Sequence, residues 1–328
     1  MTGTLIFVVG PSGVGKDTLL DGARALLEND SRFHFLKRDI TRDAAAGGED
    51  HNPVSQAEFT ARLNQGAYAL HWGAHDLRYG LPLAQLSALT EGKSVIANGS
   101  RSVLASARGR FDRFAIISVT ADEGLLRQRL RQRGRETDAD IERRIARAES
   151  FEVSGDDVFT ISNDGSVADG VAQFVECLAK LDGRLFRARP QDGIAYPRPG
   201  SYLIARRGDE FLFALTDHYS LPGGGIEAGE TAVQALEREV LEETGCRLTS
   251  APIHLCDASA YNAEEPGKYW HKLHRFFVAN VEQVTQPTEP GHKPVWVNPL
   301  KVWERLGPEV QYALKQAGLQ VPEMMSAQ

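Results

Sequence analysis

Two segments of the sequence combine residues suited to gripping polyphosphates. The first, residues 10–16, has the sequence GPSGVGK and fits the pattern G-x-x-x-x-G-K. Glycines in such a loop let backbone N–H groups curl around phosphate oxygens, and the lysine reaches the β- and γ-phosphates of a nucleotide. We therefore expect nucleotide binding by Gly10, Ser12, Gly13, Val14, Gly15, Lys16, Asp17 and Thr18, with Lys16 also catalytic.

The position after the loop lysine departs from this pattern. A Ser or Thr is usual there, and its hydroxyl binds Mg²⁺. This chain has Asp17, followed by Thr18. Since a carboxylate can also face the metal, directly or through water, we expect ATP and a divalent cation at this loop. The alternative, a glycine-rich turn at a strand end, leaves the lysine and the following helix unexplained.

The second segment, residues 224–246, has the sequence GGIEAGETAVQALEREVLEETGC. Glu239, Glu242 and Glu243 are spaced i, i+3 and i+4, so they share one face of a helix. Clustered carboxylates repel one another without a cation, and oxygen ligands favour Mg²⁺ or Mn²⁺. We expect Glu239, Glu242 and Glu243 to bind metal, and Glu230 to pair with Arg238. An amphipathic helix with a solvated acidic side explains the charges but not the glycine and arginine frame.

Hydrophobic patterns in the sequence predict the strands and helices that position these two segments. Residues 5–9 form an apolar, β-branched run typical of a buried parallel strand, and a helical pattern follows the loop as far as residue 27. Further strands are expected at 94–97 and 114–119, an arginine-rich helical stretch at 123–149 and a closing helix at 169–181. Alternating strands and helices predict a mostly parallel sheet.

The composition changes near residue 183, where a Gly-, Pro- and Arg-rich stretch without periodicity begins. We therefore expect domains at 1–182 and 199–328, with a linker at 183–198. In the second domain, strands are predicted at 201–206, 210–215, 273–281 and 295–297, and a helix at 231–244.

The first domain resembles guanylate kinases. Its segments Ile40-Thr41-Arg42-Asp43, Gly47-Gly48-Glu49 and Tyr79-Gly80 are similar to their substrate lobe. The pattern around Arg129, Arg133 and Arg144 is similar to their arginine-bearing lid, which implies that these arginines neutralise charge during phosphoryl transfer. Residues 44–46 are all alanine, however, so the base-binding set is incomplete.

A closer resemblance is to the ribose 1,5-bisphosphate phosphokinase family of phosphonate catabolism. It rests on GPSGVGKD, ITRDAAAG and NGSR (residues 98–101), and it covers roughly residues 3–181. It implies transfer of the ATP γ-phosphoryl group to ribose 1,5-bisphosphate, with 5-phosphoribosyl 1-diphosphate as product. Thr41, Arg42 and Arg101 are the candidates for holding the acceptor. A guanylate-kinase-like nucleotide kinase is the alternative.

The second segment matches the Nudix signature G-x5-E-x7-R-E-U-x-E-E-x-G-U at every position except the last, Cys246, where U is aliphatic. The resemblance implies metal-assisted attack of water on a diphosphate linked to a group X, with Glu239 and Glu243 as catalytic residues. A further acid often joins from downstream, for which Glu289 and Glu282 are candidates. Four aromatic side chains either line the pocket for X or pack in the core: Tyr269, Trp270, His271 and Trp296. A non-catalytic Nudix sensor that regulates the kinase is the alternative.

Together the two resemblances predict an α/β chain. A P-loop kinase domain with a parallel sheet and helical lid precedes an α/β/α Nudix domain with a mixed sheet. Among 328 residues, acids outnumber bases 44 to 37, which disfavours nucleic-acid coating. Three cysteines without a CxxC pair, and no apolar stretch near the ~18 residues that span a bilayer, favour a cytoplasmic enzyme. The expected partners are phosphorylated sugars or nucleotides, with no nucleic acid or membrane.

Overall fold

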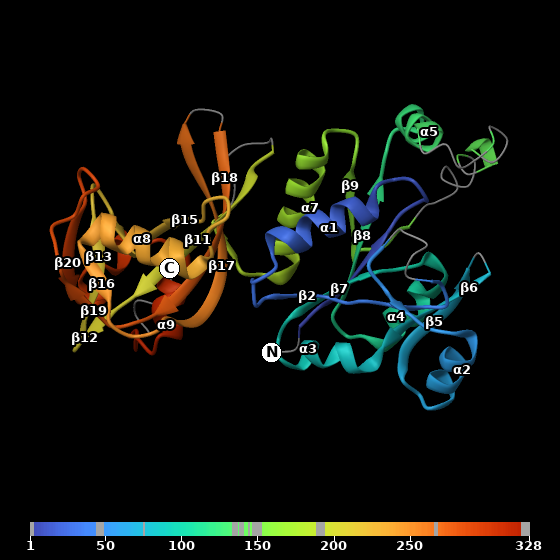
Figure 1. Ribbon diagram of the computed structural model, residues 1–328, viewed down its shortest axis with the longest axis horizontal. Helices are drawn as coiled ribbons and strands as arrows, with labels where there is room; N and C mark the ends of the chain where they lie inside the picture. The colour runs from blue at the N-terminus through green and yellow to red at the C-terminus, as the bar shows by residue number, and fades with distance from the viewer. Residues whose placement is uncertain are drawn as a thin grey trace. The chain divides into compact units, whose positions relative to one another are not determined.

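The computed structural model describes residues 3–43, 49–74, 76–132, 137, 141–143, 145, 153–187, 194–265 and 268–322. The chain divides into two compact units, Met1–Asp182 and Gly183–Gln328. Each unit has its own sheets and cores (Figure 1). Among the described residues, no helix combines the length and apolar character needed to cross a membrane.

The first unit is built on a parallel sheet, as the apolar runs predicted. Its strand order is β2-β7-β1-β8-β9, and every neighbouring pair is parallel. All five residues of the central strand β1 are buried, which fits a strand covered on both faces. The bounds are β1 Leu5–Val9, β2 Phe33–Phe35, β7 Ser94–Asn98, β8 Phe114–Thr120 and β9 Val158–Ser162.

Helices cover this sheet and fix the loop at its carboxyl edge. Helix α1 (Lys16–Leu26) lies against α7 (Val167–Asp182) (Figure 1). The two helices approach closely at Gly22, where a Cβ atom would lie 2.5 Å from a methyl of Val171. The remaining helical segments are η2 Leu83–Leu86, α3 Ser87–Thr90, η3 Arg101–Val103, α4 Leu104–Arg110 and α5 Glu123–Gln132.

A smaller lobe of the first unit has its own sheet, ordered β4-β3-β6-β5, and helix α2 (Gln56–Asn64). Its strands are β3 Asp39–Ile40, β4 Asn52–Pro53, β5 Tyr68–Ala74 and β6 Leu77–Pro82. The carboxylate of Asp39 is 1% exposed and accepts hydrogen bonds from Arg62 (2.6 Å), Tyr68 (2.9 Å) and Asn52 (3.1 Å). One buried, fully paired charge thus ties three elements of the lobe together.

The arginine-rich stretch predicted at 123–149 begins as the helix α5. Residues 141–143 and 145 are also helical. Two of the predicted lid arginines, Arg133 and Arg144, lie outside the described residues.

The second unit contains the predicted mixed sheet, ordered β10-β17-β18-β11-β15. The pairs β10–β17 and β18–β11 are parallel, and the pairs β17–β18 and β11–β15 are antiparallel. The segment 183–198, expected as a linker, contributes β10 and the start of β11 to this sheet. The bounds are β10 Leu185–Arg187, β11 Tyr196–Ile204, β15 Gly223–Gly225, β17 Ile253–Glu265 and β18 Lys268–Val278.

Opposite faces of this sheet pack against different helices because its side chains alternate. Leu203 and Phe277 lie in one core with α8 (Ala232–Thr244), whereas Ile204 and Phe276 lie in another with α9 (Pro308–Gln316). The predicted α/β/α arrangement is confirmed. The other elements are β12 Arg206–Arg207, β13 Glu210–Leu215, β14 Tyr219–Ser220, β16 Cys246–Leu248, β19 Val281–Gln283, β20 Lys293–Val297, η4 Pro299–Lys301 and η5 Trp303–Arg305.

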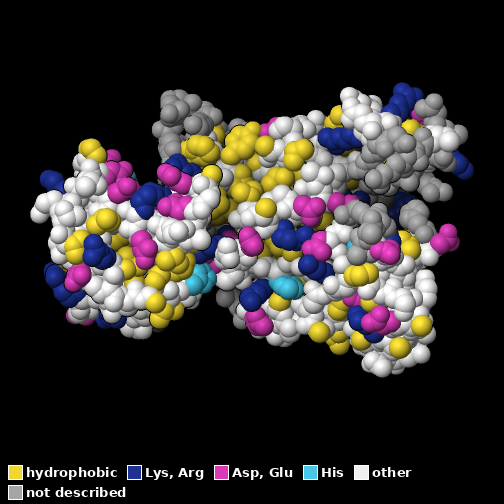
Figure 2. Space-filling view, in the orientation of Figure 1, with side chains coloured by type: hydrophobic (Ala, Val, Ile, Leu, Met, Phe, Trp, Pro, Cys, Tyr) yellow, Lys and Arg dark blue, Asp and Glu magenta, His cyan; other side chains and the backbone are white. Residues whose placement is uncertain are grey.

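The visible surface of the molecule mixes both signs of charge. Blue Lys and Arg side chains are interspersed with magenta Asp and Glu side chains over the face in Figure 2. This pattern accords with the overall formal charge of −7.

Candidate phosphate and metal sites

The glycine loop of the first unit has a backbone conformation that favours glycine. Gly13 and Gly15 have φ angles of 90° and 97°, a region that other residues rarely adopt. Gly15 caps the N-terminus of α1, where unpaired N–H groups and the helix dipole favour an anion. The Nζ atom of Lys16 donates to the carbonyl oxygens of Gly10 (2.7 Å) and Pro11 (3.0 Å), so its ammonium group lies over the loop.

Asn163 fixes the loop from the side of β9 and α7. Its side chain is 5% exposed, and its Nδ2 atom donates to the carbonyl oxygen of Val14 at 2.8 Å. A Cβ atom at Gly15 would lie 2.5 Å from Nδ2, and one at Gly170 would lie 2.5 Å from Oδ1. The amide therefore fills a slot that two glycines leave open, and it holds the loop backbone in place.

A cavity of about 270 Å³ opens beside the loop. Helix α5 forms part of its wall through Arg129 and Gln132. The buried Nη1 atom of Arg129 has no hydrogen-bond partner among the described residues. A cationic group near a phosphate loop suits a polyphosphate ligand. The cavity is lined by Gly13, Gly15, Thr18, Leu19, Arg129, Gln132, Asn163 and Val167.

On the side of the small lobe, a chain of polar contacts leads to Asp17. The Nδ2 atom of Asn98, at the end of β7, donates to Asp17 Oδ1 (3.1 Å) and to Glu49 Oε2 (2.6 Å). Glu49 in turn forms an ion pair with Arg38 through both carboxylate oxygens. The Nε atom of Arg38 donates to Glu49 Oε1 at 2.8 Å, and its Nη2 atom contacts Glu49 Oε2. Glu49 and Asn98 were predicted only as members of the Gly47-Gly48-Glu49 and NGSR segments, and Arg38 was not predicted at all. Their contacts join residues far apart in the chain, which no local spacing signals.

The candidate acceptor residues occupy different environments. The Thr41 hydroxyl accepts from the backbone N–H of Arg78 (2.8 Å) and from Gln56 (3.2 Å), so it is engaged within the lobe. The buried Nε and Nη2 atoms of Arg42 have no hydrogen-bond partner among the described residues, which suits an anion-binding group. Arg101 is exposed at the start of η3, after β7.

In the second unit, the signature segment forms strand β15, a loop and helix α8. Thr231 caps the helix in a capping box with Gln234, and Gly245 ends it with a φ of 68°. At Gly224, a Cβ atom would lie 2.4 Å from the carboxylate carbon of Glu239. Glycine is therefore required for the carboxylate of Glu239 to lie against the strand.

Arg238 braces the loop against the helix, as the sequence predicted. Its guanidinium donates to Glu230 (2.9 and 3.0 Å), to Glu239 (2.8 Å) and to the carbonyl oxygen of Gly225 (3.1 Å), and it lies 3.4 Å from Glu242. The Glu230 hydrogen bonds are the main reason why the pKa of Arg238 rises. Hydrogen bonding to Arg238 likewise lowers the pKa of Glu230. One permanent cation thus organises three of the surrounding carboxylates.

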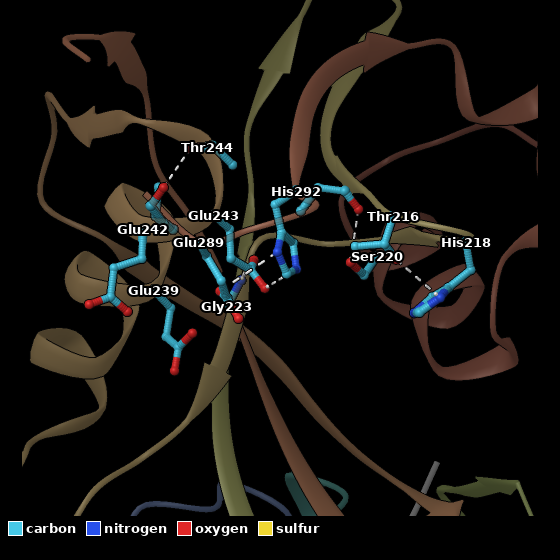
Figure 3. A network of polar contacts seen from close by, with 12 residues as sticks. Thr216, His218, Ser220, Gly223, Glu239, Glu242, Glu243, Thr244, Glu289 and His292 are labelled. Atoms are coloured by element: carbon cyan, nitrogen blue, oxygen red, sulfur yellow. Dashed lines mark hydrogen bonds and ion pairs between the residues drawn. The ribbon is translucent and has the colours of Figure 1, made fainter. Parts of the chain in front are cut away.

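Glu243 is the most deeply buried of the signature acids, with 8% of the residue exposed. Its Oε2 atom accepts from the backbone N–H of Gly223 at 2.9 Å (Figure 3). Burial, with repulsion from Glu239, Glu289 and Glu242 adding to it, raises the pKa of Glu243 to about 8. A buried carboxylate amid other carboxylates is stabilised as an anion by a cation.

Glu289 and His292 complete this cluster from a loop downstream. Ligand atoms of Glu243, Glu289 and His292 all lie within 4.8 Å of one another, and His292 Nε2 is 3.3 Å from Glu243 Oε1 (Figure 3). The backbone N–H groups of Thr288 and Glu289 donate to the carbonyl oxygen of Glu242 (2.9 and 3.0 Å), which ties the loop to α8. The two carboxylates of this cluster suit Mg²⁺ or Mn²⁺.

The structure separates the two downstream acids that the sequence left open. Glu289 joins the cluster, whereas Glu282 lies on β19 opposite Arg247 of β16. His292 was missed, because a lone histidine in a loop carries no spacing signal. Of the aromatic candidates, Tyr269 and His271 are buried at 8% and 0% exposure, and Trp296 packs in the core beside α8. Trp270 lies under the guanidinium of Arg198, 5.4 Å from its ring centre.

Comparison with known proteins assigns both units. The AAA domain family matches residues 6–151, and the NUDIX domain family matches residues 192–316. A ribose 1,5-bisphosphate phosphokinase from Brucella melitensis is 42% identical over 179 residues, which are 55% of this chain and 93% of that protein. The corresponding protein from Agrobacterium fabrum is 45% identical over 180 residues, 55% of this chain and 98% of that one.

A third relative has a different partner domain. A bifunctional ribose 1,5-bisphosphokinase-thymidine phosphorylase from Cupriavidus necator is 45% identical over 177 residues. The match covers 54% of this chain but only 29% of the length of that relative. All these similarities fall in the first unit, and the NUDIX match falls in the second. The chain therefore belongs to the ribose 1,5-bisphosphate phosphokinase family through its N-terminal unit, to which a NUDIX domain is fused.

Proposed function

We propose that the chain is a bifunctional enzyme. The first unit transfers the γ-phosphoryl group of ATP to ribose 1,5-bisphosphate, and the second unit hydrolyses a diphosphate linked to a group X. The observation that carries the kinase half is the loop of Gly13, Gly15 and Lys16 beside a cavity, in a unit 42% identical to a ribose 1,5-bisphosphate phosphokinase. The observation that carries the hydrolase half is the cluster of Glu243, Glu289 and His292 beside the braced helix.

In the kinase half, the chain positions two anions and neutralises their charge. An oxygen of the 1-phosphate of the acceptor attacks the γ-phosphorus of ATP, the bond to the ADP oxygen breaks, and ADP and 5-phosphoribosyl 1-diphosphate are released. The attacking group is already an anion, so no strong base is required. Lys16 leaves its loop carbonyls for the phosphates, and Arg129 offsets charge on the transferred group. We propose the same role, offsetting charge on the transferred group, for Arg133 and Arg144.

The acceptor requires a second set of cations on the small-lobe side. The Nε and Nη2 atoms of Arg42 have no partner among the described residues, and Arg101 is a second, exposed cation. Thr41 orients the lobe strand through its bonds to Arg78 and Gln56. Asp17 is the expected ligand of the magnesium that accompanies ATP, which would lower the charge repulsion between the two anions.

In the hydrolase half, water attacks a phosphorus of the diphosphate, the bridging P–O bond breaks, and two phosphorylated products leave. Magnesium or manganese, when bound, polarises the phosphoryl oxygens and acidifies the water. Glu243, Glu289 and His292, whose ligand atoms lie together, would hold the cation, and Glu239 and Glu242 of the same helix would join them. Glu243 or Glu239 accepts the proton of the attacking water. Arg238 keeps the loop at a fixed distance from the helix.

The kinase half is tested by supplying the purified chain with ATP and either ribose 1,5-bisphosphate or GMP. We expect turnover of the ribose bisphosphate, seen as a diphosphate doublet in ³¹P NMR. Turnover of GMP alone would instead establish the guanylate-kinase-like alternative, which the departures at residues 44–46 disfavour.

The hydrolase half is tested with a panel of nucleoside-diphosphate sugars and related diphosphates in the presence of Mg²⁺ or Mn²⁺. Hydrolysis of one class, abolished by Glu243→Gln, supports an enzyme. Binding without any hydrolysis across the panel, together with a change in kinase rate, would support a Nudix sensor.

A further inference from the structure

Asn98 connects the carboxylate of Asp17 to the small lobe. Its amide donates to Asp17 Oδ1 at 3.1 Å and to Glu49 Oε2 at 2.6 Å. We propose that Asn98 is a positioning residue that orients Asp17 for the cation of the metal–nucleotide complex, with the Arg38–Glu49 pair as its anchor. This proposal rests on the proposed kinase function.

The anchor of Asn98 is rigid. Arg38 and Glu49 form a two-pronged ion pair, and their side chains are 8% and 13% exposed. The Arg38 guanidinium also lies over the rings of Trp72 and Tyr79, 5.3 and 4.9 Å from their centres. Those two rings are themselves stacked across neighbouring strands at 5.5 Å. A planar guanidinium held by two rings and a carboxylate has little freedom to move.

The chemistry of Asp17 explains why it needs such a partner. A Ser or Thr hydroxyl at this position presents one neutral oxygen to a cation. A carboxylate presents two oxygens and a negative charge, so it can rotate out of place and it repels the phosphates of a nucleotide. A hydrogen bond from Asn98 to Oδ1 restricts that rotation and offsets part of the charge.

The identity of the bridging residue follows from its two acceptors. Asp17 and Glu49 both accept, so the residue between them must donate twice without carrying a negative charge. The NH₂ group of an asparagine has two N–H donors and does so. An aspartate at position 98 would place three carboxylates together and lose both bonds, although its size is the same.

The test is a double-mutant cycle between Asn98→Ala and Asp17→Thr in the full chain. The first readout is the additional Mn²⁺ binding that a non-hydrolysable ATP analogue induces, followed by electron paramagnetic resonance, so that Mn²⁺ bound by the second unit is subtracted. The second is steady-state kinetics at varied Mg²⁺ concentration, which distinguishes a change in KM for Mg²⁺ from a change in kcat. We expect Asn98→Ala to weaken Mn²⁺ binding about 10-fold in the parent chain. In the Asp17→Thr background it should change Mn²⁺ affinity less than about 2-fold, because a hydroxyl needs no such support.

The matched control is Asn52→Ala. Asn52 also donates to a carboxylate in the small lobe, that of Asp39 at 3.1 Å, but Asp39 is bound to Arg62 and Tyr68 rather than to the loop. This variant should leave Mn²⁺ affinity unchanged. Asn98→Asp supplies a second, isosteric variant, and should weaken Mn²⁺ binding at least as much as Asn98→Ala.

Two outcomes would overturn the proposal. One is an unchanged Mn²⁺ affinity in both Asn98 variants. The other is an equal loss in the parent chain and in the Asp17→Thr background, which would show that Asn98 does not act through Asp17. Failure of the proposed function looks different: the parent chain would bind Mn²⁺ and the nucleotide analogue but transfer no phosphoryl group to ribose 1,5-bisphosphate.

Discussion

The two units meet the same problem, the charge of a polyphosphate, with opposite electrostatics. In the first unit the chain itself supplies positive charge through Lys16, Arg129 and the N-terminus of α1. In the second unit the chain supplies carboxylates, of which Glu243 is buried and has a raised pKa. Under the proposed function, the first site therefore attracts phosphate directly, whereas the second needs a cation between protein and substrate.

This difference also determines how each site is held. The phosphate loop is fixed through its backbone, by glycines with positive φ and by the amide of Asn163. The carboxylate cluster is fixed through side chains, by Arg238 and by the backbone N–H of Gly223. A side chain added at Gly13 or Gly15 should therefore distort the first site, and loss of the charge of Arg238 should distort the second.

A large effect in the first unit is expected from Arg129. We predict that Arg129→Ala lowers kcat for phosphoryl transfer by roughly 10³-fold, the lower end for an arginine that stabilises transition-state charge. Hydrolysis by the second unit should stay unchanged. Steady-state kinetics of both reactions provide the measurement. A fall in kcat for phosphoryl transfer smaller than about 10-fold would show that Arg129 does not stabilise the transition state.

Glu243→Gln is the counterpart in the second unit. Loss of a positioned carboxylate that accepts a proton costs roughly 10²–10⁴-fold in rate. We expect such a loss of hydrolysis, with phosphoryl transfer unchanged. As a matched control, Glu282→Gln changes the same functional group on β19 and should retain full hydrolysis.

Asn163 allows the backbone-held loop to be weakened without a change of charge. Asn163→Ala leaves the buried carbonyl of Val14 without its partner, which costs about 1–3 kcal/mol. We predict weaker ATP binding by about 10-fold, measured by isothermal titration calorimetry. Parent-like ATP affinity would show that the loop holds its shape without the amide.

The stability of the metal-free protein should depend on pH through Glu243. Its folded pKa of about 8 exceeds the ordinary glutamate value of 4.5, so ionisation opposes folding. The penalty is absent below about pH 4.5, grows as pH rises between the two values, and is complete above pH 8. We expect Glu243→Gln to raise the Tm of the second unit in EDTA at about pH 9, and to have less effect near about pH 5. Excess Mg²⁺ should remove this advantage, and an unchanged Tm in EDTA at both pH values would contradict the assigned burial.

The smallest expected effect comes from the helix caps. Thr231→Ala removes the cap of α8 and should cost about 1 kcal/mol of the free energy of unfolding of the second unit. Ser55→Ala removes the corresponding cap of α2 in the first unit. Calorimetry should show that each variant shifts the melting of its own unit.

Much of the fold follows from local patterns in the sequence. The apolar run of β1, the glycine loop and α1 are contiguous, so periodicity and spacing predict them. The three signature glutamates lie on one helix, and their grouping needs no tertiary information. The mixed sheet was predicted from the resemblance, and the structure confirms it.

Other parts of the sites depend on contacts between distant residues. Asn98, Glu49 and Arg38 lie on separate elements and meet only in the folded lobe. His292 is brought to Glu243 by a loop that bonds to the end of α8. The strand β10 was hidden in a stretch rich in Gly, Pro and Arg, because its pairing with β17 rather than its own composition stabilises it. No spacing rule in one sequence encodes these contacts.

The presence of two separate active sites is tested most directly by measuring both reactions in two variants of the full chain, Lys16→Met and Glu243→Gln. Phosphoryl transfer from ATP to ribose 1,5-bisphosphate and hydrolysis of the best diphosphate substrate are both followed by ³¹P NMR. We predict that each variant loses one reaction and keeps the other at the parent rate. Loss of both reactions in either folded variant, or loss of neither, would contradict two separate sites of opposite charge.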